Sequence, residues 1–146
     1  MARKILFKAK RVDNGELVEG YAFDDGLVDS KRLFVGDLVI TDYKGSADDK
    51  WNVGINLYEV FPETLCQYTG LIDKNGKKIW ENDVVEAWSD GTMACGKVQQ
   101  RIDGTWIMYP AWQNKTMWYF IPNEFGETTV EVIGNIFDNP ELLEGR

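Results

Sequence analysis

Residues 66–85 constrain the fold of this chain more than any other segment. Their middle, residues 73–76, contains Asn75 followed by Gly76. An Asn-Gly pair readily supplies the positive φ values that a tight reversal needs. Strand-type residues stand on both sides of this reversal. The segment therefore predicts one compact unit that consists of a hairpin and a following turn.

Similar turn signals recur about every 8 to 12 residues along most of the chain, as in small sandwiches and barrels. The hydrophobic content is 44%, and 14 glycines stand against 4 prolines. Asn14 and Gly15 predict a further hairpin, between residues 5–12 and 16–23. Together these patterns predict an all-β protein.

We expect two small barrel-like subdomains, over residues 1–62 and 63–146, although one integrated domain is the alternative. Residues 36–40 and 82–86 each place a small turn residue and Asp before an apolar pair. This arrangement is similar to SH3-like barrels, and by analogy the second subdomain is expected to resemble one. Residues 139–144, with Pro at the first helical position, predict a short C-terminal helical turn.

Charge and composition narrow the function classes. The chain has 16 basic and 24 acidic residues, a net charge of -8, which repels phosphate backbones and makes nucleic-acid binding unfavourable. No apolar stretch approaches the length of a membrane span. The start lacks the apolar run of a signal peptide, and there are only two cysteines, so we expect a cytoplasmic protein with reduced thiols.

The absence of histidine removes the commonest general base and metal ligand. We predict no catalytic residues, no metal site and no cofactor, and we assign Cys66 a role as a small buried hydrophobe. Glu81 and Asp83 are two residues apart and could share a strand face. For Asp83 the alternatives are a turn cap, which we favour, and catalysis or Mg²⁺ binding.

Aromatic residues are in surplus in the second half of the chain. The predicted binding surface consists of four of them: Trp106, Tyr109, Trp112 and Trp118. Residues 106–109 are apolar on both strand faces, whereas a small barrel has only one interior. The surplus has three open interpretations, which are core or subdomain packing, a contact between copies of the chain, and a stacking platform for a ligand.

Three blocks together, residues 11–21, 62–85 and 131–143, resemble the YopX family of phage and prophage proteins. The residues that carry this resemblance in the central block are Gln67, Tyr68, Thr69, Gly70, Asp73, Asn75, Gly76 and Asp83, and we assign them mainly to folding. Asn82 stands where the family has what looks like Gly, and Asn tolerates the same left-handed geometry. The resemblance implies a small, mostly β, phage-encoded protein of unknown activity, and it supplies no catalytic residues.

The function predicted from these observations is that of a non-catalytic binding or oligomerising accessory protein. Its expected partners are further copies of itself and a host or phage protein. One alternative is an acidic protein that binds and inhibits a host nucleic-acid-binding protein. The other is a metal-dependent hydrolase that uses Glu81, Asp83 and other carboxylates.

Overall fold

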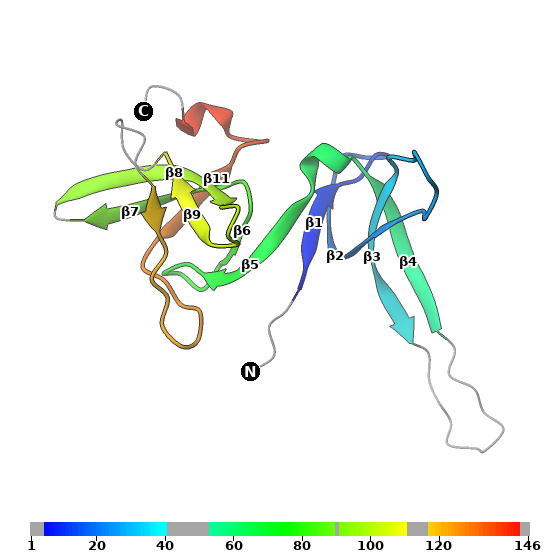
Figure 1. Cartoon of the computed structure of the whole chain (residues 1–146), viewed down its shortest axis with the longest axis horizontal. Helices are drawn as coiled ribbons and strands as arrows, with labels where there is room; N and C mark the ends of the chain where they lie inside the picture. Colours follow the sequence, from blue (N-terminus) through cyan, green and yellow to red (C-terminus); the bar gives the residue numbers. More distant parts are fainter. Residues whose placement is uncertain (1–4, 41–52, 90, 111–116, 144–146) are drawn as a thin grey trace, which may run out of the picture. The chain divides into compact units, whose positions relative to one another are not determined.

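The computed structural model describes residues 5–40, 53–89, 91–110 and 117–143. The chain forms two compact units, an N-terminal unit over Leu6–Leu65 and a C-terminal unit that begins at Cys66 (Figure 1). The subdomain boundary expected after residue 62 stays a prediction. Among the described residues, no helix has the length and apolar character that crossing a membrane requires.

Within its described residues, the N-terminal unit contains four strands and one short 3-10 turn: β1 (Phe7–Lys10), β2 (Leu17–Asp24), β3 (Leu33–Ile40), β4 (Val53–Val60) and η1 (Pro62–Thr64). The predicted first hairpin is confirmed, because β1 and β2 pair antiparallel from Phe7–Gly20 to Lys10–Leu17. Gly15 has φ +73° in its turn. The Asn14 side-chain oxygen accepts a hydrogen bond from the Glu16 N–H at 2.9 Å. Local turn chemistry thus fixes this hairpin.

Strand β2 bends at Gly20, which divides it between two partners. Its first half pairs with β1, and its second half, Tyr21–Asp24, pairs with β3 over Leu33–Gly36. A Cβ atom at Gly20 would lie 2.3 Å from the Gly36 carbonyl oxygen, so only glycine permits this close approach. The bend gives the sheet the curvature of a small barrel.

An antiparallel bridge between Arg11 and Val60 joins the end of β1 to the end of β4. The Phe61 N–H donates to the Lys10 carbonyl oxygen at 2.9 Å, and the Val12 N–H donates to the Glu59 carbonyl oxygen at 2.9 Å. Residues on the inner face of the resulting barrel form its core: Ala9, Val18, Ala22, Leu33, Val35, Val60 and Leu65. The N-terminal unit is therefore barrel-like at this end.

The described part of the C-terminal unit contains seven strands and a 3-10 turn: β5 (Cys66–Ile72), β6 (Lys78–Trp80), β7 (Asp83–Ser89), β8 (Thr92–Gln100), β9 (Trp106–Tyr109), β10 (Trp118–Tyr119), β11 (Glu131–Asn135) and η2 (Pro140–Leu143). Strands β5 and β6 form the predicted hairpin. The other five form an antiparallel sheet in the order β10-β9-β8-β7-β11. The all-β class is confirmed, whereas the likeness of this unit to an SH3-like barrel stays a prediction.

The core of the C-terminal unit lies on one face of this sheet, and its buried members are Ile79, Val85, Ala87, Ala94, Val98, Trp106, Met108 and Val130. The predicted terminal helical turn is present as η2. The Asn135 N–H donates to the Asn139 side-chain oxygen at 3.3 Å just before it. A Cβ atom at Gly134 would lie 2.8 Å from Leu142 Cδ1, which shows that η2 packs closely against β11.

Candidate binding surface

The residues of the central block that carry the family resemblance, Gln67 to Asp83, are called the signature residues, and the β5–β6 hairpin is called the signature hairpin. Asp73 organises the turn of this hairpin. The residue is only 2% exposed. Its Oδ1 accepts hydrogen bonds from the Asn75 N–H at 2.9 Å and from the Lys77 N–H at 2.8 Å. Its Oδ2 accepts one from the Val132 N–H on β11 at 3.0 Å. This carboxylate therefore closes the turn and also joins it to a strand from the end of the chain.

Other signature residues have backbone roles as well. The Thr69 hydroxyl donates to the Ile79 carbonyl oxygen at 2.7 Å and accepts from the Leu71 N–H at 3.1 Å. Gly70 and Gly76 have φ +85° and +81°, which favour glycine. These contacts account for the three residues without a ligand.

The Tyr68 ring packs at a tilt against Trp80, with 5.4 Å between ring centroids. Burial raises the pKa of the Tyr68 hydroxyl, because desolvation disfavours the phenolate. The Lys78 ammonium lies 5.8 Å from the Tyr68 ring centroid. Gln67 contributes backbone hydrogen bonds, since its carbonyl oxygen accepts from the Glu81 N–H at 2.9 Å. Tyr68 and Gln67 thus stabilise the hairpin as well.

The second signature turn, at Glu81, Asn82 and Asp83, is also built from backbone contacts. Asn82 has φ +71°, as the sequence predicts for a residue at this glycine-like position. The Glu81 Oε1 accepts from the Gln67 N–H at 3.2 Å, and the buried Asp83 Oδ2 accepts from the Trp80 N–H at 2.8 Å. Asp83 thus caps a turn, which is the role that the sequence favours.

The two cysteines, Cys66 and Cys95, are buried and not joined in a disulfide. The Asn82 side-chain amide donates to Cys66 Sγ at 3.6 Å. Within residues 5–40, 53–89, 91–110 and 117–143, no three Cys, Asp or Glu side chains come together as a metal site would require. Cys66 therefore lies where a small apolar residue is expected.

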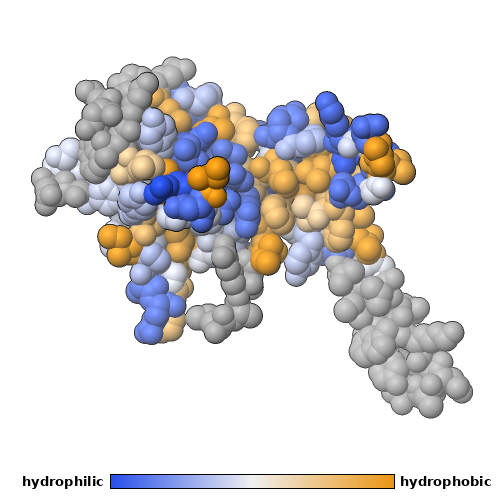
Figure 2. Space-filling model, viewed as in Figure 1, coloured by the Kyte–Doolittle hydropathy of each residue, from blue (hydrophilic) through white to orange (hydrophobic). Residues whose placement is uncertain are grey.

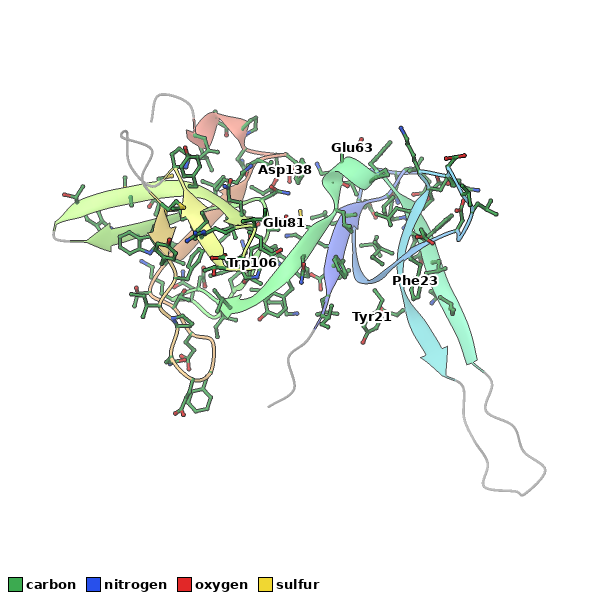
Figure 3. All side chains as sticks on the ribbon, viewed as in Figure 1. Tyr21, Phe23, Glu63, Glu81, Trp106 and Asp138 are labelled. Atoms are coloured by element: carbon green, nitrogen blue, oxygen red, sulfur yellow. The ribbon has the colours of Figure 1, made fainter. Side chains whose placement is uncertain are left out.

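The structure does not bring the three described residues of the predicted aromatic surface together on one exposed surface. Trp106 is 8% exposed and belongs to the core, so it does not lie on an exposed surface (Figure 3). Trp118 is partly buried and packs against the same core, and Tyr109 is half-buried. Trp112 lies outside the described residues.

The Trp106 indole N–H is buried and has no acceptor among the described residues. Burial of an unpaired indole N–H costs stability, and the packing of the large ring offsets this cost. This geometry identifies Trp106 as a core residue whose polar atom is not used.

A different apolar surface lies on the N-terminal unit. In antiparallel pairs, directly opposed residues point to the same face. Tyr21 pairs with Gly36 and Gly36 with Leu57, while Phe23 pairs with Phe34. One face of β2, β3 and β4 therefore carries a set of apolar side chains that we call the outer patch: Tyr21, Phe23, Phe34, Ile55 and Leu57.

The outer patch faces away from the barrel core and is accessible to solvent. The exposed fractions are 49% for Tyr21, 39% for Phe23, 52% for Ile55 and 39% for Leu57. Hydrophobic residues gather on the visible face of the N-terminal unit in Figure 2, and Tyr21 and Phe23 are labelled in Figure 3. A contiguous set of large exposed apolar residues of this kind marks an interaction surface more often than scattered single residues do.

Charged groups border the outer patch at one end. Arg32 donates two hydrogen bonds to the Glu59 carboxylate, from Nε at 3.3 Å and from Nη2 at 3.0 Å. Its guanidinium also lies 5.1 Å from the centroid of the Phe34 ring. The bond with Glu59 raises the pKa of Arg32, so the guanidinium stays charged at any physiological pH.

Sequence reasoning missed the outer patch, although a signal for it exists. In β2, Leu17, Tyr21 and Phe23 alternate with Val18 and Ala22, so both faces of the strand are apolar. Only one of these faces lines the barrel core. The other face must contact solvent or a partner.

Comparisons with known proteins identify the fold and the family. No curated protein matches the chain. A solved structure, that of protein EF1440 from Enterococcus faecalis, is similar with a TM-score of 0.57 and 21% sequence identity, over 98% of this chain and 100% of that one. At this identity the likeness shows the fold alone. The family model described as YopX protein matches residues 18–144, and the chain therefore belongs to the YopX family.

Proposed function

We propose that the chain is a non-catalytic phage or prophage accessory protein that works in the bacterial cytoplasm by assembling with copies of itself through the outer patch. The observation that carries this proposal is the exposure of Tyr21, Phe23, Ile55 and Leu57 on one face of the N-terminal unit. The signature residues support it indirectly, because their backbone contacts explain them without any bound substrate.

The size of the patch sets the expected strength of the assembly. Full burial of a large apolar side chain contributes about 1.5–3 kcal/mol. Four side chains that are roughly half exposed thus offer about 4 kcal/mol per copy, or about 8 kcal/mol for two copies. Association costs at least about 4 kcal/mol, so the patch alone leaves about 4 kcal/mol, which corresponds to a weak complex with a dissociation constant of about 1 mM.

The proposal is tested by static light scattering of the whole chain between about 10 and 500 µM, a range that suits a weak complex. We expect the mass to rise above the monomer value of 16.7 kDa as the concentration increases. Phe23→Ser should reduce that rise because it removes an exposed ring from the outer patch. Ile102→Ser is the matched control, since Ile102 is a fully exposed residue on the other unit.

A wild-type mass that stays at 16.7 kDa over the whole range contradicts self-assembly. A rise in mass that Phe23→Ser leaves unchanged places the contact elsewhere. Circular dichroism of each variant checks that the fold is retained.

A further inference from the structure

Strands β3 and β4 continue together beyond the point where β2 stops pairing with β3 (Figure 1). Pairing between β2 and β3 ends at Tyr21 and Gly36, whereas β3 and β4 stay paired as far as Ile40 and Val53. Among the described residues, no third strand pairs with this two-stranded extension. An isolated two-stranded ribbon is marginally stable in water, so a further strand would stabilise it.

The two-stranded extension has an open edge on β3 and another on β4, and the edge on β4 is the longer one. Strand β4 stands at the end of its sheet, and its contacts with the end of β1 involve only residues 59–61. The preceding residues, 53–58, contain no charged residue and no proline. Natural edge strands usually carry Lys, Pro or a bulge that prevents pairing with another chain. The open edge of β4 has none of these blocking residues.

We propose that this edge pairs antiparallel with the β4 strand of a second copy, in a register centred on Asn56. The proposal rests on the self-assembly proposed above and adds an edge contact to the contact through the outer patch. Antiparallel pairing of identical strands has two-fold symmetry, which is the commonest symmetry of protein dimers. In this register Ile55 of each copy lies opposite Leu57 of the other, and both belong to the outer patch. Edge pairing thus joins the two patches side by side, and Tyr21 and Phe23, two strands away, stay available for contact with a further copy.

Charge favours a second copy at this edge over other places on the surface. The net charge of -8 makes most approaches of two copies repulsive. Residues 53–58 carry no charge, so this approach opposes no like charges at the centre of the contact. Among the described residues, the nearest acids are Asp37, which pairs with Asn56, and Glu59. The register places the two Asp37 residues three strand spacings apart, about 14 Å, and the two Glu59 residues about 20 Å apart. Both separations exceed the Debye length of about 8 Å at physiological salt.

The test is disulfide formation by the variant Asn56→Cys in the full chain. The register places the two Asn56 positions opposite each other, where Cβ atoms are close enough for a disulfide. Asn56 is exposed, and the native Cys66 and Cys95 are buried and so do not compete. Under mild oxidation we expect most of Asn56→Cys to become a covalent dimer, at least tenfold more than the Ile102→Cys control.

Hydrogen exchange of the wild type gives a second readout. Amide protons of residues 53–58 should exchange several-fold more slowly at high than at low protein concentration, because pairing occupies the open edge. A wild type that stays monomeric in light scattering defeats both proposals. The wild type could instead self-associate while Asn56→Cys cross-links no more than Ile102→Cys and exchange in residues 53–58 does not depend on protein concentration. That result overturns this inference and leaves the proposal of self-assembly intact.

Discussion

Replacement of Asp73 by Ala should destabilise the C-terminal unit far more than replacement of an exposed carboxylate such as Asp103. The Asp73 side chain is buried and accepts three backbone hydrogen bonds, two inside the turn and one from Val132 on β11. Alanine removes all three acceptors and leaves the Val132 N–H without this partner. The loss therefore includes a contact between segments that are far apart in the sequence.

The magnitude follows from where each N–H group lies. Asn75 and Lys77 are exposed, so water can replace the carboxylate and each lost bond costs about 1 kcal/mol. The Val132 N–H is part-buried, and loss of its bond to a charged acceptor costs about 1.5–3 kcal/mol. The sum for Asp73→Ala is about 4 kcal/mol. Asp73→Asn keeps an oxygen acceptor for the turn but none for the Val132 N–H, so we expect a loss of about 2 kcal/mol in the free energy of unfolding.

Urea unfolding followed by tryptophan fluorescence measures these changes. With a slope of about 2 kcal/mol per molar, Asp73→Ala should lower the midpoint by about 2 M, and Asp73→Asn by about half as much. Asp103→Ala is the control, because Asp103 accepts an exposed backbone bond from the Thr105 N–H at 3.1 Å. A loss for Asp73→Ala no larger than that for Asp103→Ala would refute the reasoning.

Two further predictions concern backbone geometry and charge. Asn82→Ala should lower the free energy of unfolding by about 1–2 kcal/mol in the same assay, because the φ angle of Asn82 is +71° and alanine tolerates this angle poorly. Asn82→Gly should leave the free energy of unfolding nearly unchanged. Equal losses of stability for both variants would contradict this prediction. The pKa of Asp25 is lowered from 3.8, first by the Ser30 hydroxyl and then by the Leu27 N–H. Its stabilisation is thus complete at neutral pH and is lost as the pH falls below about 4 through the folded-state pKa. Ser30→Ala should raise that pKa in an NMR titration of the carboxyl carbon, and an unchanged titration would count against this cause.

The hairpins could be predicted from the sequence because their determinants are local. Asn14-Gly15 and Asn75-Gly76 set the turns of β1–β2 and β5–β6, and the structure contains both. The turn at Asn82 and the terminal turn at Pro140 were predictable for the same reason. The first and last residues of a strand are harder to predict when the strand pairs with a segment that is distant in the sequence. Strand β10, for example, covers only Trp118 and Tyr119, and its partner is β9.

The location of the exposed apolar surface could not be predicted, because it depends on which face of each strand is covered. Residues on both faces of the five-stranded sheet are buried: Met108 lies in the core, and Val84 on the opposite face is fully buried. Gly134 of β11 pairs with Val84, and a Cβ atom at Gly134 would lie 2.8 Å from Leu142 Cδ1, so η2 packs on this second face of the sheet. Part of the aromatic surplus is therefore buried within the C-terminal unit. In the N-terminal unit, the barrel covers only the inner face of β2.

The hydrogen bond between Asp73 and Val132 spans 59 residues, and this separation affects how the chain folds during synthesis. Ribosomes add about 5–20 residues per second, so Asp73 waits about 3–12 s before Val132 has been made. The strands of the N-terminal unit pair mainly with their neighbours in sequence and need no such delay. For those seconds the signature hairpin lacks β11 as a partner and is open to association with other nascent chains.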